Sequence, residues 1–171
     1  MKKLFALMLA LCLLCSAALA EGSVELNWSD VEAAANEIGG QFIAIDLGLM
    51  VWAPAGYLVL SDLNEEYTSQ GIYALIAPED LSGAIALQYV EANGADVMDC
   101  VNAIDGATDA QPMVINGLPC VNFDMAAMDA SCVAFGTEQG NLFVVSFMPM
   151  SDADFATKAT VMVASIQQVE E

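Results

Sequence analysis

The stretch MVINGLPCVNFDM, residues 113–125, decides the fold of this chain. Asn116-Gly117 stands between two apolar runs, and this dipeptide favours the two-residue turn of a β-hairpin because both central positions of that turn need positive φ. Further along the chain, apolar runs at residues 131–135 and 141–148 predict two more strands. The C-terminal half is therefore predicted to be an antiparallel meander.

Helices are predicted at three places around the strands. Ser29-Asp30-Val31-Glu32 has the spacing of a capping box and opens a helix over residues 29–38. The other helices are expected over residues 96–104 and after Ser151, the latter with Phe155, Ala159, Met162 and Ile166 on one face. Short apolar runs that predict strands lie at residues 41–47, 49–52, 57–60, 71–77 and 84–90. This order of elements predicts an α+β fold with a largely antiparallel sheet.

Four segments of the chain resemble the Mog1/PsbP-like family in their order and spacing. They are the turn Trp52-Ala53-Pro54-Ala55-Gly56-Tyr57, the hairpin Asn116-Gly117-Leu118-Pro119, the strand at residues 140–147 and the helix end Val163-Ala164-Ser165-Ile166. The resemblance covers residues 42–167 and implies an antiparallel sheet with helices on both faces. Members of the family have unrelated functions, so the resemblance assigns no functional residue.

The N-terminus has the pattern of a secretory signal peptide. Lys2 and Lys3 precede an apolar run at residues 4–14, and Ala18-Leu19-Ala20 provides small residues at a cleavage site. We therefore expect a signal peptide over residues 1–20, cleavage after Ala20 and a single globular domain over residues 21–171, secreted or extracytoplasmic. Lipid anchoring at Cys15 is the alternative, but bulky Leu14 stands where lipidation sequences normally carry a small residue.

The charge of the exported chain is strongly one-sided. All 23 acidic side chains follow Ala20, against one basic side chain, Lys158, so the formal charge is −22. Nucleic acids and anionic lipid surfaces are bound mainly through Lys and Arg, so both are excluded as partners. A protein or peptide partner would have to be neutral or basic to tolerate this charge.

The residue types exclude most catalytic chemistry. Without histidine, the chain has no Ser-His-Asp, Cys-His or HExxH arrangement, and we predict no catalytic residue, cofactor or metal centre. Paired carboxylates could still hydrolyse a glycan, and the available clusters are Glu65-Glu66, Glu79-Asp80, Asp96 with Asp99, and Asp152 with Asp154. Each cluster falls at a predicted helix start or loop, where acidic side chains are favoured for structural reasons.

Calcium is the ligand that such an acidic surface would attract most readily. The loop that begins at Asp62 has alternating oxygen side chains, but Tyr67 and Tyr73 stand where an EF-hand needs Gly and Glu. Only weak divalent association is predicted.

Three cysteines remain after signal cleavage, namely Cys100, Cys120 and Cys132. A turn centred near Ala126 would place Cys120 and Cys132 opposite each other on one sheet face, where a cross-strand disulfide is geometrically possible. Cys100 is an alternative partner. The other interpretation is that all three are small buried hydrophobic residues.

Together these observations favour a non-enzymatic exported module that uses a sheet edge or loop surface to hold a neutral or basic protein or peptide. The alternatives are a carboxylate-dependent extracellular glycan hydrolase and a weak calcium-binding surface protein.

Overall fold

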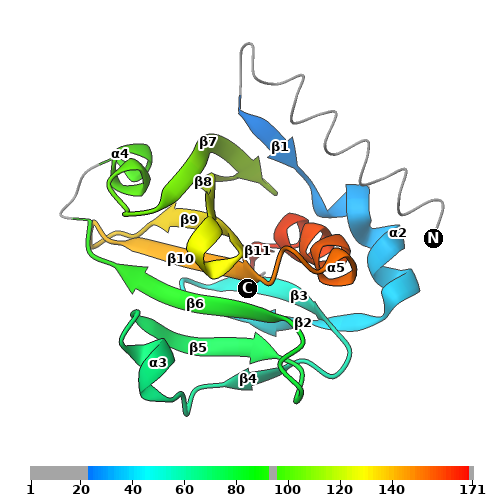
Figure 1. Cartoon of the computed structure of the whole chain (residues 1–171). Coiled ribbons are helices and arrows are strands. Elements are labelled where there is room, and N and C mark those ends of the chain that lie inside the picture. The colour runs from blue at the N-terminus through cyan, green and yellow to red at the C-terminus, as the bar shows by residue number, and fades with distance from the viewer. Residues whose placement is uncertain (1–22, 93–95, 170–171) are drawn as a thin grey trace.

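The computed structural model describes residues 23–92 and 96–169, which form two β-sheets and several helices (Figure 1). The expected signal peptide and Cys15 lie outside the described residues. In chain order the elements are β1 (Val24–Leu26), α2 (Trp28–Ile38), β2 (Gly40–Ala44), β3 (Leu49–Pro54), β4 (Leu58–Leu60), α3 (Glu65–Thr68), β5 (Ile72–Ala77), β6 (Ala84–Val90), α4 (Val97–Asn102), β7 (Ala107–Ile115), β8 (Leu118–Met125), the 3-10 helix η2 (Ala126–Met128), β9 (Ala130–Gly136), β10 (Leu142–Met148), α5 (Ala153–Ala164) and β11 (Gln167–Gln168).

The large sheet has eight strands in the order β1-β7-β8-β9-β10-β6-β5-β4, and the small sheet has the order β11-β3-β2. Two antiparallel meanders, β4 to β6 and β7 to β10, meet where β6 pairs with β10. Among the described strands, only β1 pairs in parallel, with β7. The predicted α+β fold with a largely antiparallel sheet is thus confirmed.

The hairpin of β7 and β8 forms at the predicted dipeptide. Asn116 and Gly117 have φ values of 47° and 81°, as the tight hairpin turn requires. The Asn116 side chain also joins three elements, because its Oδ1 accepts a hydrogen bond from the Trp28 backbone N–H at 2.7 Å. Its Nδ2 donates to the carbonyls of Ala164 and Ile166, both at 2.9 Å. One turn residue therefore connects the hairpin to the start of α2 and the end of α5.

One face of the large sheet, which we call the closed face, packs against α2, α5 and the small sheet. A single apolar cluster runs through all these layers and includes Phe143, Phe147 and Met162, each fully buried. Ser165, the C-cap residue of α5, is a polar residue that is fully buried beside this core. Its Oγ accepts from the Trp52 backbone N–H at 2.8 Å and donates to the Met162 carbonyl at 2.6 Å. The small sheet is thus fixed to the end of α5.

The other face, which we call the open face, is covered in separate pieces. Helix α4 lies over β7, β8 and β9, while α3 contacts β5, and Figure 1 shows these two short helices well apart. Two distinct apolar clusters lie beneath them, one around Phe123 and one around Leu75. Helices cover both faces, as the resemblance implied, but the open face is covered incompletely.

Several local predictions differ from the structure. Helix α2 begins at Trp28, and its N-cap residue Asn27 makes no side-chain hydrogen bond. The prediction that Ser29 caps this helix is therefore wrong. Asn116 from the β7–β8 turn accepts the hydrogen bond of the Trp28 N–H at the helix start. Asp152 caps α5 in place of Ser151 and accepts from the Phe155 backbone N–H. Strand β7 begins at Ala107, six residues before the apolar run at Met113 that predicted it. Across the described residues, no helix is both long and apolar enough to span a bilayer.

Candidate functional site

A groove crosses the open face where the strands carry small side chains in line. Leu58 of β4 pairs with Ala77 of β5, and Met148 of β10 pairs with Ala84 of β6. Ile76 pairs with Ile85 in antiparallel register, and since Ala77 follows Ile76 while Ala84 precedes Ile85, the two alanines also lie side by side. The two alanines form a row of small side chains between an exposed leucine at the sheet edge and a methionine on the other side, and Ala84 forms the floor of the groove.

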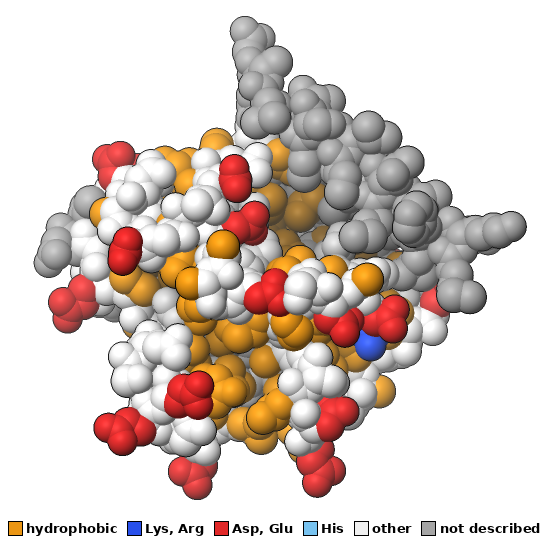
Figure 2. Space-filling model, in the orientation of Figure 1, with side chains coloured by type: hydrophobic (Ala, Val, Ile, Leu, Met, Phe, Trp, Pro, Cys, Tyr) orange, Lys and Arg blue, Asp and Glu red, His pale blue; other side chains and the backbone are white. Residues whose placement is uncertain are grey.

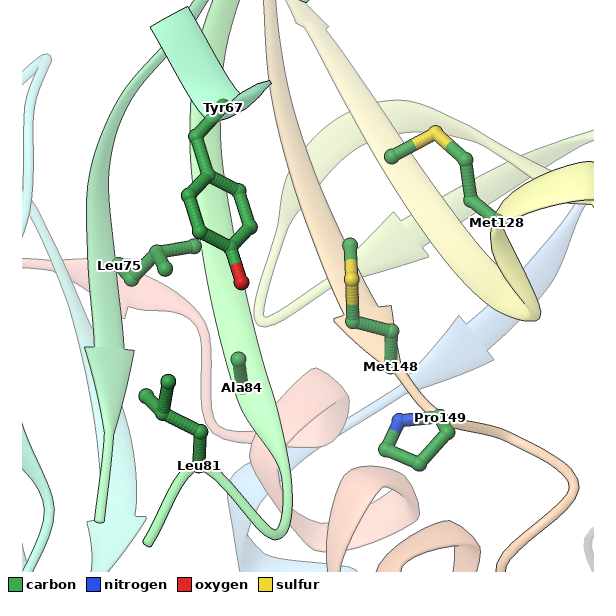
Figure 3. Close-up of a pocket in the computed structure, with 7 residues that line it drawn as sticks. All are labelled: Tyr67, Leu75, Leu81, Ala84, Met128, Met148 and Pro149. Atoms are coloured by element: carbon green, nitrogen blue, oxygen red, sulfur yellow. The ribbon is translucent and has the colours of Figure 1, made fainter. Parts of the chain in front are cut away.

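Above this floor is a cavity of about 210 Å³. We call this cavity, with its mouth, the open-face groove. The residues that line it come from six segments of the chain and are Tyr67, Leu75, Leu81, Ala84, Met128, Met148 and Pro149. Figure 3 shows Tyr67, Leu75 and Leu81 on one side, Met128, Met148 and Pro149 on the other, and Ala84 between them. Six of the seven lining side chains are apolar, and Tyr67 adds a hydroxyl.

The mouth of the groove exposes large apolar side chains to solvent. Leu81, which lines the groove, is 48% exposed, and Leu58, on the edge strand two strands away from Ala84, is 59% exposed. Figure 2 shows apolar side chains gathered in the hollow between α3 and the loop before β6, with carboxylates around it. Contiguous apolar surface of this kind is typical of interaction sites, whereas isolated exposed leucines are ordinary.

Leu81 occupies an unfavourable backbone conformation in the loop at residues 78–83. Its φ of 53° lies in the left-handed region, which costs about 1–2 kcal/mol for a residue with a β-carbon. The loop is held by a turn in which the Leu81 N–H donates to the Pro78 carbonyl at 3.0 Å. The Ser82 backbone N–H donates to Asp80 Oδ1 at 3.1 Å. These bonds keep an apolar side chain at the groove mouth.

The opposite wall is anchored by Asp129, which follows η2. Its carboxylate accepts hydrogen bonds from the backbone N–H and the hydroxyl of Ser151. Its carbonyl accepts from the Met150 N–H at 2.8 Å. The turn that carries Met128 is therefore tied to the segment that carries Pro149, so this wall is preformed.

Acidic residues adjoin the groove along the chain on both sides. Glu66 precedes the lining residue Tyr67, Asp80 precedes Leu81, and Asp129 follows Met128. Asp80 is fully exposed, and the hydrogen bonds from Ser82 lower its pKa, so it stays ionised at neutral pH. The groove is thus an apolar cavity with a negatively charged surround.

The carboxylate clusters found in the sequence serve local structure. Asn64 caps α3 by accepting from the Glu66 and Tyr67 backbone N–H groups, which accounts for the polar loop that starts at Asp62. Asp96 caps α4 and Asp152 caps α5. Within residues 23–92 and 96–169, no three His, Cys, Asp or Glu side chains converge in a metal-binding arrangement. The lining of the groove contains no carboxylate.

The predicted Cys120–Cys132 pair is wrong, because the two side chains lie on opposite faces of the large sheet. Met125 pairs with Ala130, so Cys132 stands opposite Phe123 and belongs to the open-face core. Cys120 belongs to the closed-face core. The turn is centred beyond Ala127 rather than near Ala126, and this shift in register changes which side chains share a face.

All three described cysteines are free thiols, and Cys120 and Cys132 are buried, as the alternative interpretation held, whereas Cys100 is only half-buried. Burial raises the pKa of Cys120 to about 12 and that of Cys132 to about 11. Cys132 Sγ also donates to the buried Ser146 hydroxyl at 3.2 Å. These two thiols are protonated core residues, since the reactive form of cysteine is the thiolate.

Outside the groove, a pair of stacked tyrosines lies beside the turn between β2 and β3. The Tyr73 and Tyr89 rings stack with their centroids 5.7 Å apart, and the Tyr73 hydroxyl donates to Asp46 Oδ2 at 3.0 Å. Burial and this hydrogen bond raise the pKa of Tyr73. Because Asp46 belongs to the small sheet's turn, the tyrosine pair joins the small sheet to β5.

Sequence reasoning did not find the groove. Leu81 was a visible signal, because it is the one large apolar residue in the loop of Pro, Glu, Asp, Ser and Gly at residues 78–83. The alanine floor gave no local signal, since Ala84 lies among the apolar residues of β6.

Comparison with known proteins adds a structural likeness. Cyanobacterial PsbP (CyanoP) from Synechocystis sp. PCC 6803 superposes with a TM-score of 0.50, covering 77% of this chain and 93% of that one at 11% sequence identity. This chain has a PsbP-like fold. The resemblance drawn from the sequence is thereby confirmed at the level of architecture. No family model matches the PsbP-like chain, and no curated protein matches it in sequence.

Proposed function

We propose that this PsbP-like chain is an exported, non-enzymatic binding module that holds a neutral or basic protein or peptide segment in the open-face groove. The observation that carries the proposal is the groove itself. The exposed Leu81 and other large side chains surround the small Ala84, on a sheet face that α3 and α4 cover only in part. A sheet face of this kind is normally buried against another layer, and a partner segment would supply that layer.

The negative charge of the chain favours a neutral or basic partner. With a formal net charge of −20 over the whole sequence, an acidic segment would be repelled from the groove. Glu66, Asp80 and Asp129 add local negative charge next to lining residues. A segment with an apolar centre and Lys or Arg beside it would match both properties of the surface.

Export is part of the proposal and rests on the N-terminal sequence. Lys2, Lys3, the apolar run and Ala18-Leu19-Ala20 have the order of a cleavable signal. Neither alternative function has support in the groove, because its lining carries neither the two carboxylates of a glycan hydrolase nor the oxygen ligands of a calcium site.

Three synthetic peptides test the proposal by isothermal titration with the protein purified after export. They share one apolar centre and carry lysine, serine or glutamate on both sides of it. We expect the lysine peptide to bind most tightly, the serine peptide weakly and the glutamate peptide not at all. Added salt should weaken the binding of the lysine peptide, because salt screens the attraction between exposed charges.

A matched pair of variants locates the binding. Leu81 and Leu47 are both exposed leucines with positive φ, but only Leu81 lines the groove. We expect Leu81→Asn to weaken the lysine peptide about tenfold, as loss of a buried apolar side chain does, and Leu47→Asn to leave it unchanged. Absence of binding by both the lysine and the serine peptide, or equal losses in both variants, would contradict the proposal.

A further inference from the structure

The size of the open-face groove fits one large side chain. Its volume of about 210 Å³ equals the share of roughly seven water molecules in the liquid. Pockets for drug-sized ligands and cofactors usually measure about 300–1,000 Å³. The cavity is therefore small for an organic cofactor and suitable for a single anchor side chain of a protein.

The walls of the groove favour an aromatic anchor. Met128 and Met148 both line it, and Figure 3 shows their side chains on the wall that faces Tyr67. Methionine sulfur makes favourable contacts with aromatic rings, worth about 0.3–1.5 kcal/mol each, and the flexible side chain adapts to a flat ring. An aromatic ring between these methionines and the Tyr67 ring would gain contacts that an aliphatic side chain lacks.

One polar group inside the groove favours a ring with a polar edge. The Tyr67 hydroxyl is the only side-chain oxygen or nitrogen among the seven lining residues. Figure 3 shows it directed toward Ala84 on the floor, and because Tyr67 is only half-buried, this hydroxyl is accessible to a ligand in the groove. Buried tryptophan N–H and tyrosine O–H groups usually find a hydrogen-bond partner.

We infer that the groove binds a single tryptophan or tyrosine side chain of a second protein, carried on a segment with Lys or Arg on both sides. This inference rests on the proposed function and specifies its ligand. The basic flanks follow from the carboxylates of Glu66, Asp80 and Asp129 beside the lining. A second copy of this chain is disfavoured as the partner, because two acidic surfaces would repel each other.

The test uses heptapeptides with two lysines on each side of Gly-X-Gly, where X is Trp, Tyr, Phe, Leu or Ala, titrated calorimetrically into the exported protein. We expect the Trp and Tyr peptides to bind about tenfold more tightly than the Leu peptide, from the sulfur contacts and the hydrogen bond together. The Ala peptide should bind at least tenfold more weakly than the Leu peptide, since it buries little apolar surface.

The variant Tyr67→Phe tests the hydrogen bond with the ring retained. It should weaken the Trp and Tyr peptides about three- to tenfold and leave the Phe peptide unchanged, because only the first two have a polar edge. A control variant, Tyr73→Phe, removes a hydroxyl outside the groove and should change none of the affinities.

The possible outcomes separate the two proposals. If the Leu peptide binds as tightly as the Trp and Tyr peptides, or Tyr67→Phe weakens the Phe peptide equally, the aromatic inference is overturned while the proposed function stands. If no lysine-flanked peptide binds, both fail. If the free protein forms a dimer that Leu81→Asn dissociates, measured by sedimentation, the groove is occupied by a second copy and the inference is overturned.

Discussion

The two faces of the large sheet are built from the same strands but differ in how they are covered. Along β10, Phe143, Val145 and Phe147 face the closed side and are fully buried in its continuous core. Of the alternate residues, Leu142 and Val144 are fully buried in the open-face cluster around Phe123, whereas Met148, at the end of the strand, is half-buried between two separate apolar clusters. The closed face is therefore packed along the whole of β10, whereas the open face ends beside the groove in a flexible, half-buried methionine.

This difference separates stability from binding. A close-packed core leaves no space for a ligand, and its substitution costs stability directly. A half-covered face with a small alanine floor contributes less to folding and leaves apolar surface for a partner. The account predicts that substitutions on the closed face change the free energy of unfolding, whereas substitutions around the groove change affinity.

The largest effect on stability is expected from truncation of a core residue on the closed face, compared with truncation of a groove residue on the open face. Phe143→Ala should lower the free energy of unfolding by about 3–5 kcal/mol, because it removes a fully buried ring and leaves a cavity. Met148→Ala should cost about 1 kcal/mol, since its side chain is only half-buried and borders existing space. Urea unfolding followed by circular dichroism measures both. Equal losses would show that the two faces do not differ as described.

The next effect concerns the junction at the hairpin. Asn116→Gly keeps a residue that accepts positive φ but removes three hydrogen bonds to the ends of α2 and α5. At about 1 kcal/mol for each bond, we expect a loss near 2–3 kcal/mol in urea unfolding. Asn116→Asp keeps the acceptor for Trp28 but places a charge against two carbonyls, so it should cost more. If Asn116→Gly is as stable as the wild type, the turn conformation stabilises this junction and the three side-chain hydrogen bonds do not.

A smaller effect is expected from the exposed leucines. Leu81→Asn and Leu47→Asn should each leave the free energy of unfolding unchanged or raise it by up to about 1 kcal/mol, because asparagine tolerates positive φ better than leucine. The same unfolding measurements apply. A clear destabilisation by Leu81→Asn alone would assign that leucine to the core and weaken its role at the groove.

The smallest effect concerns the tyrosine pair on the closed side. Burial and the hydrogen bond to Asp46 raise the pKa of Tyr73 above 10, so the folded state favours the neutral phenol. The neutral Tyr73 side chain therefore contributes its full share to the free energy of unfolding below pH 10, and this contribution is lost as the pH rises further. Melting temperatures between pH 8 and pH 11 should fall less steeply for Tyr73→Phe than for the wild type. Parallel curves for the two proteins would contradict this role.

The sequence predicted the elements whose signals are local. The Asn116-Gly117 turn, the four strands of the C-terminal meander and the buried face of α5 at Phe155, Ala159 and Met162 all follow from short-range pattern. Strand β1 was missed, because it has three residues and is stabilised by pairing with β7, almost ninety positions later.

The sites were harder to predict because they depend on register. The Cys120–Cys132 pairing required the centre of a turn to be known within one residue, and the assumed centre placed both thiols on the same face. The groove requires the three strands β5, β6 and β10 in register before Leu75, Ala84 and Met148 form its floor and walls. Neither property is contained in the local sequence of any one strand.

The most direct test of the account follows methionine methyl groups by NMR while the lysine-flanked Trp peptide is added. Met128 and Met148 line the groove, and Met162 is fully buried in the closed-face core. We predict chemical-shift changes at Met128 and Met148 that saturate with the peptide, and none at Met162. Saturable changes at Met162, or none at Met128 and Met148, would contradict the assignment of binding to the open face.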